Sequence, residues 1–287
     1  MYQILNKANL NPTVTKMVIT APFVARKTQP GQFVILRIDE KGERLPFTVA
    51  DYDREKGTVT IIFQQVGKAT KQLGLLGEGD EIMDFVGPLG MPTPLEGIRR
   101  AAVVGGGLGC AIAWPQARKL FDSGAKVDII AGFRNRDMVI LEDEMRACSD
   151  RFFLCTDDGS YGEKGLVTNI LERLIAEGAH YDCVIAIGPL PMMKFVSRLT
   201  KQYQIRTIVS MNPIMIDGTG MCGCCRVTVG GKTKFACVDG PDFDGHQIDF
   251  DEAMARLSTY KKEETRELDH YCRMMEQADG LEQQPGR

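Results

Sequence analysis

Residues 101–133 read AAVVGGGLGCAIAWPQARKLFDSGAKVDIIAGF, and this stretch decides the fold of the middle of the chain. A short apolar run enters a glycine loop, the loop opens a helical pattern, and a second apolar run, KVDIIAGF, follows at once. Strand, glycine turn, helix and strand in this order predict a βαβ unit with parallel strands. Pro115 lies inside the helical pattern and predicts a kink or a nonstandard helix start.

The segments that follow repeat this alternation. LEDEMRACSD is typical of a charged helix and RFFLCT of a strand, and then LVTNILERLIAEG indicates a helix and YDCVIAIG a strand. Strands that alternate with helices indicate a parallel sheet covered by helices. We therefore predict an α/β domain over residues 98–210.

The glycine loop is a candidate phosphate-binding turn, because it follows a strand and opens a helix. Its residues are Gly105, Gly106, Gly107, Leu108 and Gly109. The loop departs from the G-x-G-x-x-G/A fingerprint at Cys110, so it is not a standard dinucleotide site. Asp128 stands at the start of the second strand, whereas Arg134 follows its end. An arginine there suits a 2′-phosphate or a diphosphate, so both NADH and NADPH remain open.

Two further loops follow predicted strands, at the sheet edge where open α/β sheets bind ligands. The first loop is TDDGSYG at 156–162, which contains Asp157, and the second is GPLPMM at 188–193, which contains Gly188, Pro189 and Met192. The alternative for the first loop is an Asx-rich turn. For the second it is a helix-capping loop with methionines in the core. Two such loops at one sheet edge favour ligand binding.

Six short alternating segments precede this domain, separated by turn residues such as Gln29-Pro30-Gly31 and Lys56-Gly57. The segments are YQILNKANL, VTKMVITAP, QFVILRIDE, LPFTVADYD, TVTIIFQQV and DEIMDFVGP. This pattern predicts a small antiparallel β-barrel over residues 1–97.

The barrel contains two candidate ligand-binding stretches. In RLPFT, Arg44 suits a pyrophosphate or flavin phosphate, Phe47 suits packing on a ring, and Thr48 suits a hydrogen bond near the flavin N5. Pro46 sets the bend between them. In VGKAT at 66–70, backbone N–H groups at a helix start could cradle a diphosphate. The candidates there are Gly67, Ala69 and Thr70. The alternatives are a solvated charge for Arg44 and a plain turn glycine for Gly67.

Residues 211–249 contain the most specific motif, DGTGMCGCCRVTVGGKTKFAC at 217–237. The spacing is Asp217-x4-Cys222-x2-Cys225-x11-Cys237, which matches a plant-type [2Fe–2S] site with a carboxylate in place of the first thiolate. RVTV, two glycines and KTKFAC predict a hairpin that returns Cys237 to the others. Four thiolates including Cys224 could instead hold structural zinc, or some of these cysteines could be buried thiols. We favour Asp217 over Cys224 as the fourth ligand.

Composition excludes several classes of protein. The net charge of −3 and the absence of a basic stripe argue against nucleic-acid binding. No apolar run is long enough for a signal peptide or a membrane span, so no membrane association is expected. Nine cysteines, three of them within four positions, indicate metal binding in a reducing, cytoplasmic compartment.

Residues 250–287 are predicted to form a charged helix. This helix either lies on its own domain or docks a partner, and the final LEQQPGR is expected to be disordered.

Taken in order, these parts resemble the ferredoxin-NADP reductase superfamily, over roughly residues 1–250. The cysteine motif is similar to that of the electron-transfer subunits related to dihydroorotate dehydrogenase. Asp217, where those relatives have cysteine, points towards the small subunits of NADH-dependent reduced ferredoxin:NADP⁺ oxidoreductases and sulfide dehydrogenases. Relatives often carry cysteine just before the last Gly-Pro, where this chain has Ile187, so the surroundings of the nicotinamide differ.

The resemblance implies an antiparallel β-barrel flavin domain at 1–97, an α/β parallel-sheet nucleotide-binding domain at 98–210, a small [2Fe–2S] segment at 211–249 and a helical tail at 250–287. It assigns Arg44, Pro46, Phe47 and Thr48, with Gly67 and Thr70, to FAD. The glycine loop with Arg134, Asp157 and Gly188-Pro189 would bind NAD(H), with NADP(H) less favoured. Thr48 is the best candidate near flavin N5, and no side chain is expected to act as acid or base.

The implied function is electron transfer between NAD(H), FAD and the cluster, and on to a larger partner with flavin and [4Fe–4S] clusters in a bifurcating oxidoreductase. Ferredoxin would be reached through that partner. One alternative is the electron-transfer subunit of a dihydroorotate-type dehydrogenase or sulfide dehydrogenase. A second, of another class, is a zinc-stabilised nucleotide-binding regulatory module.

Overall fold

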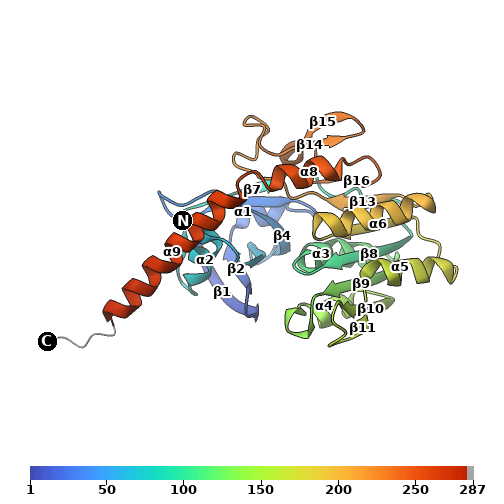
Figure 1. Ribbon diagram of the computed structural model, residues 1–287, viewed down its shortest axis with the longest axis horizontal. Helices are drawn as coiled ribbons and strands as arrows, with labels where there is room; N and C mark the ends of the chain where they lie inside the picture. The colour runs from blue at the N-terminus through green and yellow to red at the C-terminus, as the bar shows by residue number, and fades with distance from the viewer. Residues whose placement is uncertain (283–287) are drawn as a thin grey trace.

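Seven antiparallel strands form the first sheet of the computed structural model, which describes residues 1–282 (Figure 1). Their order is β6-β1-β2-β5-β4-β3-β7. The strands are β1 (Tyr2–Asn11), β2 (Val14–Thr20), β3 (Phe33–Arg37), β4 (Leu45–Asp53), β5 (Thr58–Gln64), β6 (Glu81–Ile82) and β7 (Asp84–Leu89), with the helices α1 (Pro22–Lys27) and α2 (Lys68–Leu75) between them.

The two edge strands of this sheet are consecutive in the chain. β6 pairs with β1 and β7 pairs with β3, and only Met83 separates them. The chain therefore crosses from one edge of the sheet to the other and nearly closes it into the predicted barrel. The segment DEIMDFVGP, predicted as one strand, is two strands because its halves pair with opposite edges.

The second sheet has the order β11-β10-β9-β8-β12-β13-β16. All its neighbours are parallel except β13 and β16. Its strands are β8 (Arg100–Gly106), β9 (Lys126–Phe133), β10 (Arg151–Thr156), β11 (Glu163–Lys164), β12 (Cys183–Ile187), β13 (Thr207–Ser210) and β16 (Asp242–Asp244). The strand order reverses at β8, which lies between β9 and β12 and so marks the crevice where such sheets bind ligands.

Helices cover both faces of the parallel sheet, as the predicted alternation requires (Figure 1). They are α3 (Gly109–Asp122), the short 3₁₀ turn η1 (Arg136–Met138), α4 (Glu142–Ala147), α5 (Val167–Ala176) and α6 (Leu190–Gln202). Alternate residues of β8 face opposite cores: Ala101 and Val103 pack in the core with α3, and Ala102 and Val104 in the core with α5 and α6. α3 continues through Pro115 as a single helix.

The segment after β13 contains the predicted hairpin, formed by β14 (Arg226–Val229) and β15 (Lys232–Phe235). Gly230 and Gly231 turn it with positive φ angles of 58° and 75°. The short helix α7 (Ala236–Asp239) follows. The segment packs on the barrel through a small core of Phe33, Ile35, Met215, Cys225, Ala236 and Cys237.

The tail forms two helices, α8 (Phe250–Leu257) and α9 (Lys261–Glu282), rather than the one predicted. α8 packs against α6 and β14, whereas α9 passes α2 and then projects away from the body (Figure 1). The predicted disordered end, LEQQPGR, spans residues 281–287. Its first two residues are the last two of α9, and residues 283–287 lie outside the described part of the chain. None of the helices within residues 1–282 is both long and apolar enough to cross a bilayer.

Candidate functional site

A cavity of about 490 Å³ lies between the barrel and the parallel sheet. Thr48, Gln64 and Val66 line it from the barrel. From the other side it is lined by residues at the carboxyl ends of the parallel strands, among them Gly106, Gly107, Leu108, Gly109, Arg134, Gly188 and Pro189. Folding therefore brings together candidates from both predicted domains, at the crevice where the strand order reverses.

The glycine loop allows the first residue of α3, Gly109, to pack directly against the backbone at the end of β12. A Cβ atom at Gly109 would lie 2.2 Å from the carbonyl oxygen of Ile187, so only glycine fits there. Cys110, the departure from the fingerprint, is fully buried behind Gly105. Burial raises the pKa of the Cys110 thiol far above its ordinary value. This cysteine therefore acts as a small core residue and leaves the loop free to face the cavity.

A neighbouring cavity of about 250 Å³ extends the crevice along the sheet. Gly106, Gly107, Arg134 and Pro189 line it together with Asp157 and Met192. Arg134 thus borders both cavities. In the loop after β10 the carboxylate of Asp158 accepts hydrogen bonds from the backbone and hydroxyl of Ser160, at 2.9 and 2.7 Å. This is the Asx-type turn that we considered as an alternative, and it leaves Asp157 at the cavity wall.

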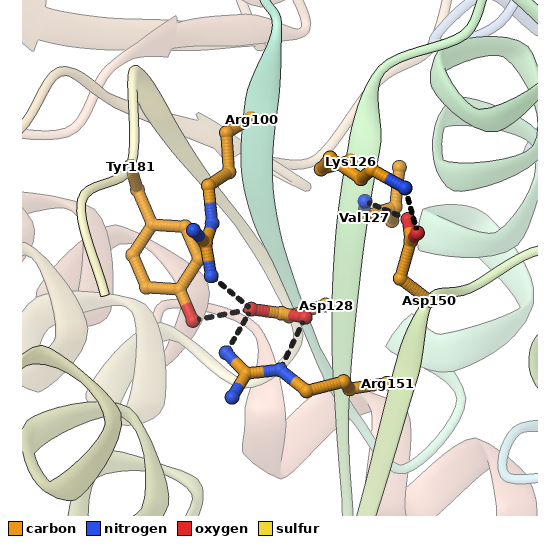
Figure 2. Close-up of polar contacts among 7 residues, drawn as sticks. All are labelled: Arg100, Lys126, Val127, Asp128, Asp150, Arg151 and Tyr181. Atoms are coloured by element: carbon orange, nitrogen blue, oxygen red, sulfur yellow. Dashed lines mark hydrogen bonds and ion pairs between the residues drawn. The ribbon is translucent and has the colours of Figure 1, made fainter. Parts of the chain in front are cut away.

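Asp128, the acidic residue considered for ribose binding, lies away from this crevice, and its carboxylate is hydrogen-bonded to other side chains. Arg151 donates to both of its carboxylate oxygens, at 2.9 and 2.6 Å, and the hydroxyl of Tyr181 donates at 2.7 Å (Figure 2). Arg100 lies 3.8 Å away. Burial alone would raise the pKa of Asp128, but the hydrogen bonds from Arg151 and Tyr181 outweigh it and the pKa is lowered. The network is structural, and Asp128 is not available to a ribose.

The RLPFT candidates, at and just before the start of β4, point to different surroundings. Thr48 lines the 490 Å³ cavity and also a cavity of about 240 Å³, which Pro46 shares. Phe47 points the other way and packs on Phe63 in the barrel, with ring centroids 5.4 Å apart. Arg44 reaches neither cavity: its Nε donates to the carbonyl oxygen of Ile216 at 2.6 Å. Strand alternation explains the split between Phe47 and its neighbours.

The VGKAT stretch forms the start of α2, and its polar atoms are largely bonded to one another. The hydroxyl oxygen of Thr70 accepts from the N–H groups of Val66 and Gly67 and donates to the carbonyl of Gly67. Ala69 is buried. Val66 alone of this stretch lines the large cavity. Lys68 pairs with Glu267 of α9 at 3.4 Å.

The predicted cluster ligands occupy one segment but differ in burial. The Sγ atoms of Cys225 and Cys237 lie 3.2 Å apart, and both residues are 1% exposed, whereas Cys222 is exposed. The carboxylate of Asp217 accepts from the backbone N–H groups of Thr219 and Cys222, at 3.0 and 2.9 Å. The bond from Thr219 is the largest of the contacts that lower the pKa of Asp217, to about 2. The carboxylate is therefore ionised at neutral pH, as a metal ligand must be.

The donor set of three thiols and one carboxylate suits iron–sulfur coordination, with one thiol pair already in contact. Within residues 1–282 no three of these side chains, or of any other acidic, histidine or cysteine side chains, converge closely enough to hold a metal ion. Cys224 lies beside Cys222, whose side chain raises the pKa of the Cys224 thiol, and it also lines a small apolar pocket with Ala253 and Leu257 of α8.

Sequence reasoning missed several residues of the cavity walls. Ser210, Met211 and Asn212 line the large cavity, and the last two also line the 240 Å³ cavity with Pro241 and Met215. These residues lie at or just after the carboxyl end of β13. The rule that we applied to the loops after β10 and β12 would have found the residues after β13.

Comparisons with known proteins agree with this arrangement. Residues 212–249 match the family described as the iron–sulfur cluster binding domain of dihydroorotate dehydrogenase B. An uncharacterized protein of Clostridium beijerinckii is 52% identical over 272 residues, which is 92% of each chain. A Thermotoga maritima protein named as a homolog of the electron transfer subunit of dihydroorotate dehydrogenase B (NAD⁺) is 45% identical over 91% of this chain and 92% of its own length.

A solved structure of an NADH-dependent reduced ferredoxin-NADP oxidoreductase, described in connection with flavin-based electron bifurcation, is also similar. It superposes with a TM-score of 0.89 and 42% identity over 95% of this chain and 98% of its own chain. A ferredoxin NADP⁺ reductase from Neisseria gonorrhoeae with bound FAD and NADP shares the fold, with a TM-score of 0.57 at 18% identity over 70% of this chain and 89% of its own. The ferredoxin-NADP reductase-like fold predicted from the sequence is confirmed.

Proposed function

The chain belongs to the family of iron–sulfur flavoprotein electron-transfer subunits that includes the one of dihydroorotate dehydrogenase B, and we propose that it passes electrons between NAD(H), FAD and a [2Fe–2S] cluster to a larger partner subunit. One arrangement of residues supports this above all. Thr48 borders the cavity of the glycine loop and also the cavity of Met215, which packs with Cys225 and Cys237. The three proposed sites are therefore contiguous.

Each proposed cofactor has candidate residues around these cavities. FAD would lie against β4 and the start of α2, where Pro46 and Thr48 line these cavities. The other FAD candidates, Phe47, Gly67, Ala69 and Thr70, do not line them and would contribute by shaping the strand and the helix start beside the flavin. NAD(H) would bind at residues 105–109 with Arg134, Asp157, Gly188, Pro189 and Met192. The cluster would be held by Asp217, Cys222, Cys225 and Cys237.

Bound FAD supplies the conversion between the two-electron chemistry of a nicotinamide and the one-electron chemistry of a cluster. The protein has to hold the reacting rings in register and keep water out. Thr48 and the glycine loop face each other across one cavity and suit this positioning role. We therefore assign no acid or base, and Thr48 is the residue that we place nearest to flavin N5.

We further propose that the partner is a larger subunit with its own flavin and [4Fe–4S] clusters, that ferredoxin is reached through it, and that the assembly lies in the cytoplasm. The 42% identity to the NADH-dependent reduced ferredoxin-NADP oxidoreductase chain supports this choice of partner. In such an assembly this chain is the NAD(H) arm.

An anaerobic visible spectrum with metal analysis, followed by EPR after addition of NADH and then NADPH, tests the proposal. We expect flavin bleaching and a reduced [2Fe–2S] signal, stronger with NADH. A preference for NADPH would overturn the nucleotide assignment but keep the electron path. A colourless protein that holds zinc would support the regulatory-module alternative instead.

The match of residues 212–249 also favours a second candidate, the electron-transfer subunit of a dihydroorotate-type dehydrogenase. Purification of the tagged chain from its native cells distinguishes the two. A partner that oxidises dihydroorotate would support the second candidate, and a partner rich in [4Fe–4S] clusters would support the first.

A further inference from the structure

Arg44 connects the barrel to the loop that carries Asp217. It immediately precedes β4, the strand of Thr48. Its Nε donates to the carbonyl oxygen of Ile216 at 2.6 Å, and its Nη2 lies 3.4 Å from the carbonyl oxygen of Asp217. The guanidinium thus grips two successive main-chain carbonyls of a segment 172 residues away in sequence.

The same loop is held from a second side by the barrel wall. Gly218 has a φ of +77°, and a Cβ atom there would lie 2.7 Å from Ile35 Cδ1 and 2.8 Å from Leu89 Cδ1. The main chain at 218 therefore lies directly on β3 and β7, which only glycine permits. Together, Arg44 and this contact fix the backbone on both sides of the Asp217 side chain.

Arg44 contacts the main chain at Asp217 and not the side-chain carboxylate. The hydrogen bonds of this carboxylate are to Thr219 and Cys222 of its own loop, whereas the contacts of Arg44 are to the main-chain carbonyl oxygens of Ile216 and Asp217. The arginine consequently orients the ligand through its main chain and adds a positive charge nearby, without competing for the carboxylate oxygens.

Resting on the proposed function, we propose that Arg44 is a positioning residue for the iron–sulfur site and not a ligand of the flavin phosphate. It holds the backbone of Asp217 against the flavin strand, so that the two proposed redox sites keep a fixed separation. Reduction of a cluster adds negative charge, and a nearby cation favours that state. Because Arg44 is exposed, solvent screens its charge and the electrostatic effect is moderate.

The test compares Arg44→Met and Arg44→Lys with the wild-type chain. The matched control is Arg54→Met, because Arg54 also sits on the barrel and donates to a carbonyl, that of Thr28, at 3.0 Å. FAD content is measured from the visible spectrum. The EPR g values and the midpoint potential of the cluster are measured by redox titration.

We expect Arg44→Met to keep its FAD, to alter the EPR g values, and to lower the midpoint potential. The equilibrium constant for reduction of the cluster should fall threefold to tenfold. A tenfold fall corresponds to about 59 mV for a one-electron couple. Arg44→Lys should recover part of the shift, since lysine restores the charge but not the two-pronged contact. Arg54→Met should match the wild type.

Loss of FAD from Arg44→Met with an unchanged cluster signal would overturn the inference and restore the flavin-phosphate role. Unchanged g values and potential in both variants would overturn it as well. In either case the wild-type cluster signal would leave the proposed function standing. A wild-type protein without any [2Fe–2S] signal would overturn the proposed function and this inference with it.

Discussion

Asp128 shows how a single buried charge is accommodated in this protein. It is 3% exposed near the start of β9, an inner strand of the parallel sheet, where an ionised carboxylate is costly unless it is paired. Arg151 on the neighbouring strand and Tyr181 before β12 supply three hydrogen bonds (Figure 2). The residue therefore joins β9 to β10 and to the chain before β12, at a distance from the ligand crevice.

The variant Asp128→Asn is expected to lower the free energy of unfolding by about 2 kcal/mol at pH 7, because it removes the buried carboxylate of an ion pair whose arginine is partly exposed to solvent. The pKa of Asp128 is lowered in the fold, so its contribution is present above the unfolded pKa of about 4 and is lost as the pH falls through the folded value. Urea unfolding at pH 7 and pH 3 measures this, and the difference from wild type should shrink at pH 3.

Asp150→Asn is the control for this variant. Asp150 pairs with the exposed Lys126 at 2.8 Å and accepts from the N–H of Val127 (Figure 2). Its loss should cost about 1 kcal/mol or less. Equal losses for the two variants would contradict the view that burial sets the strength of the Asp128 network.

Asp217 carries the second prediction at this scale. A thiolate donates more electron density to iron than a carboxylate does, so the variant Asp217→Cys should stabilise the oxidised cluster and shift the midpoint potential to more negative values. Redox titration followed by EPR measures the shift, and Cys224→Ser serves as the control. An unchanged potential and spectrum in Asp217→Cys would argue against Asp217 as a ligand, and loss of the cluster in Cys224→Ser would favour Cys224.

At the scale of elements, the start of α3 depends on its close approach to β12. The contact of Gly109 is with the backbone oxygen of Ile187, which cannot move aside. At Gly106 the nearest atom to an added Cβ would be the Sδ of Met192, the end of a flexible side chain. The two glycines of one loop thus differ in what surrounds them.

Gly109→Ala is therefore expected to lower the free energy of unfolding by about 2–3 kcal/mol, as overpacking does elsewhere. Gly106→Ala should cost clearly less, because Met192 can adopt another rotamer. Thermal and urea unfolding of both variants measure the difference. If Gly106→Ala proved the more damaging, the close helix–strand approach would not be the reason for Gly109.

The elements of the cluster segment are not a separate layer. Its strand β16 pairs with β13 and extends the parallel sheet by one antiparallel edge strand, while its cysteines pack on β3 of the barrel. The division into 1–97, 98–210, 211–249 and 250–287 remains a prediction. Limited proteolysis would show which of these boundaries are accessible.

At the scale of the whole molecule, a buried polar cluster around Asp242 joins the parts. Its Oδ2 accepts from the hydroxyl of Thr93 at 2.5 Å and from Gln116 of α3 at 3.3 Å, and it lies close to Gly31 of the barrel. Its Oδ1 and the Oε1 of Gln116 have no hydrogen-bond partner among the described residues. Burial raises the pKa of Asp242 from 3.8 to about 6.

This shift predicts a pH dependence of stability. A carboxyl group whose pKa is raised in the fold contributes stability that is complete below the unfolded pKa of about 4 and is lost as the pH rises through about 6. At about 1.4 kcal/mol per pKa unit, the loss is at most about 3 kcal/mol. Asp242→Asn should remove this pH dependence and be more stable than wild type at pH 8, since an amide can donate to Gln116 Oε1.

Urea unfolding of the wild type and Asp242→Asn at pH 5 and pH 8 measures this. Thr93→Val is the companion variant, because it removes one donor to Asp242 and should lower stability at both pH values. A wild type whose stability rises between pH 5 and pH 8 relative to Asp242→Asn would contradict the prediction.

Most of the fold was predictable from the sequence. The βαβ order, the barrel strands and the hairpin at 226–235 all follow from apolar periodicity and turn residues within short windows. Of the site, Thr48 and the residues at the carboxyl ends of β8, β9, β10 and β12 were predictable too. They follow from a rule that ties ligand binding to one edge of a parallel sheet.

What the sequence by itself determined is local, because hydrophobic period, glycine conformation and ligand spacing act over a few residues. Only the tertiary structure decided contacts across long stretches of chain. It divided DEIMDFVGP between two sheet edges, brought Arg44 to the carbonyls of Ile216 and Asp217, and placed Met211 and Asn212 in the cavity walls. Such pairings depend on how whole elements pack, and no short-range pattern in the chain encodes which distant partner a side chain will meet.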